Sequence, residues 1–481
     1  MEKSKYIKSI LFAAALALML ALAGCGQEPA YRHDLDLRGK GLEGVEQSAI
    51  EHAVYIDLRD SGITDLSFIP DNGPLMGLDV RGNDIKPEEI DKYSDRIDIF
   101  WSVPFSGQVY DNDTQKLTID AESFDPDTLD NLRYFRKLKI CDLSAVKDLD
   151  SEKVGELQEL MPGTTFIWNI SLGKSSVLST VTELSLDSRG YTDLTGLKYC
   201  KSLKGVTLRP SCSGIDISPL KDVPSLEKLE ILYAQPESYE PLKEMRSLKR
   251  LQIVDGEFED LTPVSGLTQL EELYIEQTLK RSDRFDSLDP IKNLTNLTAL
   301  DMTGMGVKDV SAIGAMTKLQ TLYLLNNPIE DMSAAANLHE LVSLDITNTL
   351  VTDISFLSGT TKLKRLSLGG VDAKLANSGY GFPSVGKSVI EDYSPISKLT
   401  SLTNLIIVYT QIDDLSFIEP LVNLRDLDIA GDKIGDLTPM TKLPKLTYVT
   451  ACDCGINAAK QKELKEAMPD TQFMFSWDEL F

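Results

Sequence analysis

The residues that most resemble a chemical site are Gly381, Gly386, Lys387 and Ser388, which are spaced as in the G-x-x-x-x-G-K-S phosphate-binding motif. In nucleotide-hydrolysing enzymes this loop joins a buried strand to a helix whose N-terminal N–H groups point at the phosphates. From Val389 onward, however, the sequence returns to a repeated pattern and does not form an amphipathic helix. No acidic partner strand for magnesium is evident. We therefore expect no nucleotide hydrolysis and no cofactor.

A second candidate for chemistry is a column of aspartates that recurs once in each repeat. A calcium ion needs about six to eight oxygen ligands, and a single aspartate in each repeat does not supply them. Each aspartate instead comes two residues before the start of a short turn, where a carboxylate can accept backbone N–H groups. We interpret the column as helix caps and expect no metal site. The ten aspartates are Asp65, Asp193, Asp216, Asp260, Asp309, Asp331, Asp353, Asp392, Asp414 and Asp436.

Catalysis has little support among the remaining residues. The three histidines are His33, His52 and His339, and no nucleophile is placed beside any of them. Paired carboxylates are plentiful in so acidic a chain, so counting alone does not exclude a glycosidase-like pair. The repeated pattern nevertheless leaves no separate domain to form a pocket. We expect no catalytic residues and a protein that is not an enzyme.

The N-terminus has the pattern of a bacterial export signal. Lys3, Lys5 and Lys8 precede an uncharged apolar run over residues 10–23, which is shorter than the about 20 residues of a membrane-spanning helix. The run ends in Leu-Ala-Gly-Cys, which resembles the lipobox of bacterial lipoproteins. That resemblance implies cleavage before Cys25, attachment of lipid to its thiol, and an outward-facing position on the cell membrane. An ordinary cleaved signal with a coincidental cysteine is the alternative.

The five other cysteines are an odd number, so at least one has no partner in the chain. The Cys-x-Cys pair near the C-terminus lacks the second pair or nearby histidine of a zinc site. We expect all five to be small buried side chains. They are Cys141, Cys200, Cys212, Cys452 and Cys454.

The overall charge argues against nucleic-acid binding. The formal charge is −25, and residues 1–24 carry three lysines and one glutamate, a net of +2, so their removal leaves −27. A surface this acidic is repelled by phosphate backbones.

The elements that must position any site are short repeats that dominate the chain from about Val181. Most units are 22 residues long, and each places apolar residues at positions 1, 4, 6, 11, 14, 17 and 20. Two apolar residues two positions apart predict a short strand. An Asn at position 9, such as Asn327, can form hydrogen bonds to the backbone of the turn that ends this strand. The Asp-capped segment predicts a single helical turn. The twelve units begin at Val181, Leu203, Leu226, Leu248, Leu270, Leu297, Leu319, Leu341, Leu363, Leu402, Leu424 and Leu446.

This pattern resembles the 22-residue leucine-rich repeats of the internalin family of bacterial surface proteins. The resemblance implies an α/β leucine-rich-repeat solenoid, with a curved parallel β-sheet on the concave face and short helical or 3-10 returns on the convex face. The chain departs from that family because neither an immunoglobulin-like domain nor a wall-sorting tail follows the repeats. In our interpretation the lipid replaces that tail, and a role in host adhesion is not carried over.

The predicted organisation has five parts. A lipoprotein signal peptide (1–24) and a short tether (25–33) precede N-terminal variant repeats with helical returns (34–172). Regular 22-residue repeats (173–455) and a C-terminal cap (456–481) follow. Residues 149–168 and 456–475 share one pattern, an amphipathic helix that runs into a closing strand. We favour one continuous array, with fused modules as the alternative.

The concave face is the predicted binding surface, because positions 3, 5, 7 and 8 of each unit face outward from the sheet and are not needed for the core. Five of the 16 tyrosines fall there, beside several aliphatic residues. Tyrosine is enriched in binding surfaces, although β-propensity alone also favours it. The predicted partner-binding residues are Leu232, Tyr233, Val254, Tyr274, Tyr323, Leu325, Ile406, Val408, Tyr409 and Tyr448.

The expected partner is an extracellular or envelope protein, ahead of a glycan. The alternative is a structural envelope scaffold without a specific ligand. Two units carry insertions, around Lys280–Asp286 and Asp372–Ser388, and because both leave the stack after the strand they emerge on one edge. Loops longer than a repeat needs are often functional, so the space between them is a second candidate site.

Overall fold

The computed structural model describes residues 34–187, 189–277, 285–370 and 389–480. Several predictions fall outside these residues: the signal peptide, Cys25 and the tether, the phosphate-loop motif at Gly381–Ser388, and most of both insertions. The chain divides into two compact units, residues 1–169 and 170–481. Each unit is therefore described by itself.

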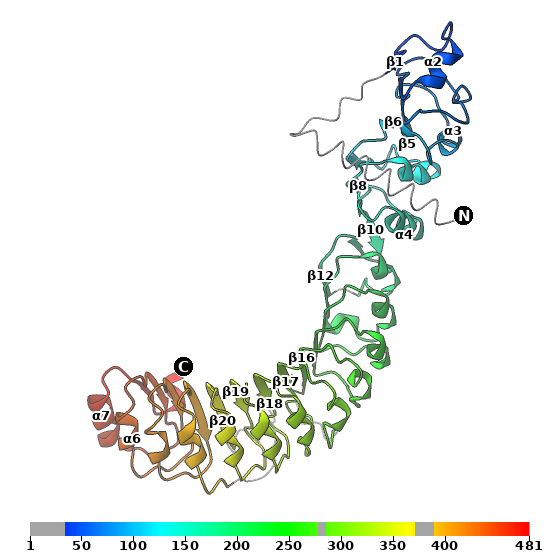
Figure 1. The fold of residues 1–481 in the computed structure, drawn as a ribbon. Coiled ribbons are helices and arrows are strands. Elements are labelled where there is room, and N and C mark those ends of the chain that lie inside the picture. The colour runs from blue at the N-terminus through cyan, green and yellow to red at the C-terminus, as the bar shows by residue number, and fades with distance from the viewer. Residues whose placement is uncertain (1–33, 188, 278–284, 371–388, 481) are drawn as a thin grey trace. The chain divides into compact units, whose positions relative to one another are not determined.

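The first unit contains two small parallel sheets and a hairpin (Figure 1). The first sheet consists of β1 (Leu35–Asp36), β2 (Tyr55–Asp57), β3 (Gly77–Asp79) and β4 (Asp98–Phe100). The second consists of β7 (Lys116–Thr118), β8 (Ile140–Asp142) and β9 (Thr165–Ile167). Their returns include α2 (Gln47–His52), α3 (Pro87–Asp91), the 3-10 helix η1 (Pro126–Tyr134) and α4 (Ser151–Leu160).

An antiparallel hairpin, which the repeat pattern did not predict, lies between these sheets. Its strands are β5 (Ser102–Phe105) and β6 (Gln108–Asp111). The two linking residues, Ser106 and Gly107, both have positive φ, 49° and 71°. Two such residues form the tight turn whose twist matches paired strands, so Ser-Gly between two apolar stretches was the available signal.

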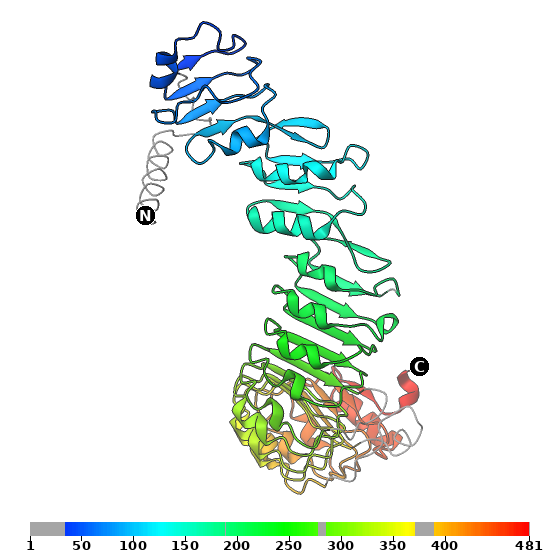
Figure 2. The same ribbon diagram turned by 90° about the vertical axis from the view of Figure 1, so that its right-hand side faces the viewer.

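The second unit is built around a parallel sheet of thirteen strands in sequence order. Figure 2 shows its first strands stacked one on the next, with the returns along one side. A short pair, β10 (Asn169–Ser171) and β11 (Ser176–Leu178), comes just before it. The thirteen strands are β12 (Glu183–Leu186), β13 (Gly205–Leu208), β14 (Lys228–Leu232), β15 (Arg250–Val254), β16 (Glu272–Glu276), β17 (Ala299–Asp301), β18 (Thr321–Tyr323), β19 (Ser343–Asp345), β20 (Arg365–Gly369), β21 (Asn404–Val408), β22 (Asp426–Asp428), β23 (Tyr448–Thr450) and β24 (Gln472–Met474).

Each of the twelve sequence repeats supplies one of these strands, beginning at its third position. The leucines of the pattern form the core, and Leu319, Leu322 and Leu324 are each 0 % exposed. The fold is the predicted α/β leucine-rich-repeat solenoid, with the returns opposite the sheet. The returns are η2 (Thr195–Tyr199), η4 (Ser218–Asp222), η5 (Glu240–Glu244), η6 (Thr262–Val264), η7 (Asp289–Ile291), η8 (Ser311–Ala315), η9 (Ser333–Asn337), η10 (Ser355–Gly359), η11 (Ser394–Lys398), η12 (Ser416–Ile418) and α6 (Thr438–Thr441). The other short helices are η3 (Pro210–Cys212), α7 (Ala458–Ala467) and η13 (Trp477–Leu480).

The ten predicted cap aspartates all act as caps. Each carboxylate accepts the backbone N–H of the residue two positions later, which is a serine or threonine in every repeat. For Asp331 the distance from Ser333 N to Oδ1 is 2.7 Å, and these bonds hold the pKa of Asp331 below its usual value. The aspartate column therefore has a structural explanation.

Buried side chains at position 9 satisfy the backbone inside the stack. The amide of Asn327 donates to Met302 O and Leu324 O at 2.8 Å each, and its oxygen accepts from Val307 N at 2.9 Å. Cys454 takes the same position in the last regular repeat, where its thiol donates to Ile429 O at 3.1 Å. All five of these cysteines lie in the described chain and are buried, as expected.

The stack ends in α7 followed by β24, the same order as α4 followed by β9 in the first unit. Leu464 of α7 and Phe473 of β24 are 2 % and 6 % exposed, so this segment covers the apolar side of β23. Among the residues described, no helix is both long and apolar enough to cross a membrane.

Candidate binding face

The inner face of the second unit is formed by three parallel rows of side chains, at positions 3, 5 and 7 of the repeats. The register of the strands places equivalent positions side by side, about 4.8 Å apart. Along the middle row, Gln252, Tyr274, Asp301, Tyr323 and Asp345 are successive partners. We call these three rows, from β14 to β23, the inner face.

Nine of the ten predicted binding residues contribute surface to the inner face or its rim. Tyr233 is 54 % exposed and Ile406 is 38 % exposed. Val254 is different, because it is only 6 % exposed and belongs largely to the core. The half-buried residues are Leu232, Tyr274, Tyr323, Leu325, Val408, Tyr409 and Tyr448.

Most of the aliphatic members lie in two groups, and Leu325, after β18, lies between them. Leu232 and Tyr233 lie at the end of β14, and the other group lies over β21 to β23, where it includes Ile406, Val408 and Tyr448. Val408 packs against the buried cluster of Ala430, Cys452 and Met474, which anchors the second group on the sheet. The strands between the two groups carry a more polar surface.

Two of the tyrosines have an unusual backbone conformation. Tyr233 and Tyr409 occupy position 8, with φ of 54° and 55°. The other units of this array with positive φ at this position place there Asp255, Asn326, Asn348, Asp453, Gly304 and Gly431. Those residue types tolerate the left-handed region, whereas a bulky side chain there is an outlier that costs roughly 1–3 kcal/mol. The backbone conformation therefore does not explain why tyrosine occupies these two positions.

The ring of Tyr409 lies against Gly431, the residue at position 8 of the next repeat. A Cβ atom added at Gly431 would come within 2.2 Å of Cδ1 of that ring. The small neighbour is thus required by the tyrosine, and the two residues together shape this edge of the inner face.

The tyrosines of the middle row are held by polar contacts. The hydroxyl of Tyr274 donates to Glu272 Oε2 at 3.2 Å, and the guanidinium of Arg250 lies over its ring, 4.7 Å from the centroid. Burial raises the pKa of Tyr274. The hydroxyl of Tyr323 is 3.2 Å from Ser343 Oγ. These contacts hold the hydroxyl groups of both tyrosines.

Carboxylates occupy the centre of the inner face, between the two apolar groups. Asp301 is 7 % exposed and accepts the N–H of Thr303 at 2.9 Å. Burial, helped by the nearby charges of Glu276 and Asp345 and opposed by the hydrogen bonds from Thr303, raises its pKa to about 7. Burial also raises the pKa values of Glu276 and Asp345. A raised carboxyl pKa means that the negative charge is not fully compensated.

This acidic centre was not among the predicted binding residues. The repeat pattern showed that position 5 faces outward, but not that the surrounding side chains would bury Asp301. The sequence did contain a signal of this acidic centre. Two residues after Asp301 and Asp345 stand Thr303 and Thr347, and not a lysine or arginine that could neutralise the carboxylate.

The first unit treats the equivalent aspartates differently. In its first sheet, each position-5 aspartate is followed two residues later by an arginine, in Asp36-x-Arg38, Asp57-x-Arg59 and Asp79-x-Arg81. In its second sheet, Asp142 is followed by Ser144, whose N–H donates to the carboxylate at 3.0 Å. The shortest distances between aspartate and arginine are 2.8 Å for the first pair and 2.7 Å for the other two. Each of the first two arginines also reaches the aspartate of the next strand, at 3.3 Å and 3.5 Å. These aspartates and arginines form a continuous charged ladder.

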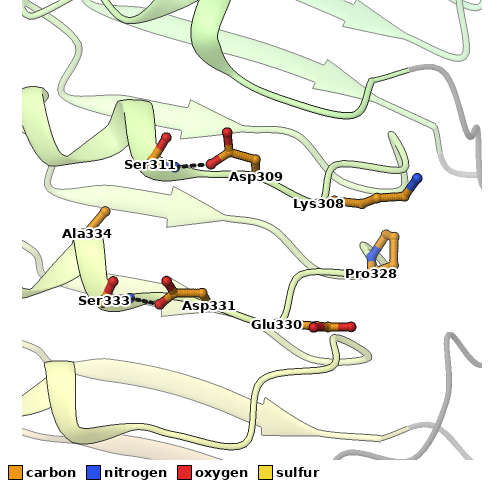
Figure 3. A pocket seen from close by; sticks show the side chains of 8 residues that line it. All are labelled: Lys308, Asp309, Ser311, Pro328, Glu330, Asp331, Ser333 and Ala334. Atoms are coloured by element: carbon orange, nitrogen blue, oxygen red, sulfur yellow. Dashed lines mark hydrogen bonds between the residues drawn. The ribbon is translucent and has the colours of Figure 1, made fainter.

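The outer side of the second unit contains a shallow groove of about 360 Å³ between two returns (Figure 3). Asp309 and Asp331 line it, and both are engaged in capping. Lys308 projects away from them and pairs with Asp286 at 2.7 Å. Within the described parts of the chain, no group of three or more His, Cys, Asp or Glu side chains is arranged to hold a metal ion. The groove repeats the ordinary geometry between neighbouring repeats.

The two described histidines are bound to the backbone. Nδ1 of His52 lies 2.7 Å from Ser48 O, and Nδ1 of His339 lies 3.0 Å from Gly359 O. The first contact lies within one helical turn and the second joins neighbouring repeats, and no acid–base pair follows from either.

No family model matches the chain, and no curated protein matches it by sequence. Among solved structures, an internalin of Listeria monocytogenes is 24 % identical over 57 % of this chain and 89 % of its own, with a TM-score of 0.41. A leucine-rich-repeat protein of Leptospira interrogans is 16 % identical over 89 % of this chain and 97 % of its own, with a TM-score of 0.46. These likenesses concern repeat architecture, so the function has to be argued from the inner face itself.

Proposed function

We propose that this protein is a lipid-anchored, extracellular leucine-rich-repeat protein that binds a protein or peptide partner through the inner face. The observation that carries the proposal is the pair Tyr233 and Tyr409, which stay in the left-handed region at a position where Asn, Asp and Gly would fold better. Large aromatic side chains that are partly exposed supply contact area at low entropic cost. Half-buried apolar residues beside them support the same use.

The membrane anchor rests on the sequence around Cys25. The basic start, the short apolar run and Leu-Ala-Gly-Cys together support lipid attachment at that thiol, and two or three acyl chains make anchoring stable. Labelling of growing cells with an alkyne fatty acid tests this part. We expect label on the wild-type chain and none on Cys25→Ala, and equal label on both would contradict the anchor.

The binding function is tested by a triple substitution of Tyr274, Tyr323 and Tyr409 to alanine. Once a partner has been captured from intact cells, its affinity for the purified triple variant should fall at least tenfold, or about 1.4 kcal/mol. Tyr199→Ala, on the return side, is the matched control and should bind as the wild type does. Unchanged affinity in a folded triple variant would overturn the assignment of the inner face.

A structural envelope scaffold is the alternative, and crosslinking on intact cells separates the two. Recognition predicts one recurrent crosslinked partner, whereas a scaffold predicts diffuse capture of many neighbours.

A further inference from the structure

We propose that the centre of the inner face binds an arginine side chain of the protein partner, with its guanidinium over the ring of Tyr323, between the carboxylates of Asp301 and Asp345 on the strands to either side. This inference rests on the proposed function and adds the chemistry of the residue that is recognised. Three observations support it: an internal precedent in the first unit, the lack of a lysine or arginine in the same two rows among the described residues of the second, and the stacking surface offered by the tyrosines.

The precedent is the charged ladder of the first unit. Arg59 Nη2 lies 2.7 Å from Asp57 Oδ2, while its Nε lies 3.5 Å from Asp79 Oδ2. One guanidinium thus joins aspartates of two neighbouring strands, which suits its planar set of donors. The Asp79 side chain is 8 % exposed and still pairs with Arg81 at 2.7 Å. A largely buried aspartate of this row is therefore paired with an arginine in the chain itself.

The second unit has the aspartates without the arginines. At the position two residues after Asp301 and Asp345 stand Thr303 and Thr347, and each donates its N–H to the aspartate, both at 2.9 Å. At positions 5 and 7 of the units that contain β16 to β22, all of which are described residues, there is no lysine or arginine. The carboxylates of this stretch therefore have no cation in their own rows, and a partner can supply one.

The tyrosines supply the rest of the site. Tyr274 and Tyr323 are the strand neighbours of Asp301 on either side. Arg250 already shows how a guanidinium behaves here, because it stacks over the Tyr274 ring and pairs with Glu272. A planar guanidinium between an aromatic face and a carboxylate gains from both contacts, whereas a lysine ammonium cannot form the two-pronged bond.

The first test selects partners without assuming any. A phage library of random 12-residue peptides is panned against the purified chain, and the selected peptides are synthesised with each arginine in turn replaced by citrulline, its uncharged isostere. We expect enrichment of arginine and at least a tenfold loss of affinity on one such replacement. Selected peptides without arginine enrichment would overturn the proposal, as would failure to select any peptide while a control protein yields binders.

The second test supplies the missing cation from the chain itself. In the double variant Thr303→Arg and Thr347→Arg, the new side chains can pair with Asp301 and Asp345 as Arg59 pairs with Asp57. We expect the variant to be at least as heat-stable as the wild type and to lose at least tenfold in affinity for the arginine peptides. The matched control is Thr352→Arg, an exposed threonine outside the strands, which should leave binding unchanged apart from a small non-specific effect of charge.

The two proposals fail in different ways. If Tyr274, Tyr323 and Tyr409 matter for binding while the double arginine variant binds as tightly as the wild type, the binding face stands and the arginine site is wrong. If neither set of variants affects binding, the proposed function is wrong as well. If the double arginine variant folds poorly, the double variant Asp301→Asn and Asp345→Asn replaces it. This variant removes both negative charges and keeps the shape of the side chains, so it should also lose at least tenfold in affinity for the arginine peptides.

Discussion

At the scale of single residues, the same repeat position serves two purposes in this chain. At position 5, Asp57 and Asp79 are neutralised within the first unit, whereas Asp301 and Asp345 in the second are not. At position 8, most units place a residue that suits the left-handed backbone, while Tyr233 does not. Departures of this kind from what folding alone favours are expected where a surface has been kept for binding.

Tyr233 offers a direct separation of binding from stability. Because asparagine tolerates positive φ and the tyrosine side chain is 54 % exposed, Tyr233→Asn should leave the chain equally stable or more stable by up to about 1 kcal/mol. Affinity for a partner should nevertheless fall. Urea unfolding followed by circular dichroism gives the stability, and a clear destabilisation would show that the tyrosine has a structural role.

Asp301 predicts a characteristic dependence on pH. Its pKa in the folded chain, about 7, lies above the unfolded value near 3.9, so the folded state disfavours the charged form. That cost is largest above pH 7 and disappears as the pH falls through the folded pKa toward the unfolded one. Asp301→Asn should therefore stabilise the chain by about 1–3 kcal/mol at pH 8 and by much less at pH 5.

Thermal unfolding of Asp301→Asn at the two pH values measures this difference. Asp413→Asn, which changes an exposed aspartate outside the strands, is the control and should have little effect at either pH. Equal effects of Asp301→Asn at pH 8 and pH 5 would contradict the assigned burial.

The sequence predicted which repeat positions face outward on the inner face but not the chemistry at its centre. Position in the repeat fixes which way a side chain points, so Tyr274, Tyr323 and Ile406 could be selected from spacing alone. The raised pKa of Asp301 depends on how deeply neighbouring strands bury it, and Val254 lost its exposure for the same reason. Depth of burial is a property of the packed sheet and is not contained in the spacing.

At the scale of elements, the repeat is stabilised by buried polar side chains as much as by its leucines. Asn327 forms three hydrogen bonds of 2.8–2.9 Å to buried backbone groups of its own and the preceding repeat. Such elements were predictable because cap and turn residues act locally. The hairpin β5–β6 was missed because it interrupts the repeat, and a search for one period does not detect an insertion of another kind.

Removal of the Asn327 side chain should be costly. In Asn327→Ala, one buried N–H and two buried carbonyls lose their partner, which predicts a loss of about 2–4 kcal/mol in the free energy of unfolding. Thr352→Ala, an exposed position with no such role, should change stability by less than about 0.5 kcal/mol. Urea titration of both variants compares them, and similar stabilities would show that the position-9 bonds contribute little.

At the scale of the whole molecule, each repeat can bury its apolar side only against its neighbours, so the ends of a stack need covering. The segment from α7 to β24 does this at the C-terminal end of the second unit. The period made the solenoid predictable from sequence. The division into two compact units was less predictable from sequence. The weaker N-terminal pattern was compatible with one continuous array as well as with fused modules.

Deletion of residues 458–481 tests the capping role. Loss of α7 and β24 exposes the edge of β23 and apolar residues such as Val449, which is 0 % exposed in the intact chain. We expect the shortened protein to aggregate or to unfold at lower urea concentration than the intact protein, as measured by size-exclusion chromatography and circular dichroism. A monomeric, equally stable product would show that no cap is required.

The central claim, that the inner face recognises a protein partner, is tested most directly by photocrosslinking on intact cells from two single sites. A crosslinking amino acid replaces Ile406 on the inner face or, as the control, Val422 in the turn before β22; the two residues are 38 % and 47 % exposed. The account predicts one recurrent protein adduct from position 406 and none from position 422. Equal or equally diffuse capture from both positions would contradict it.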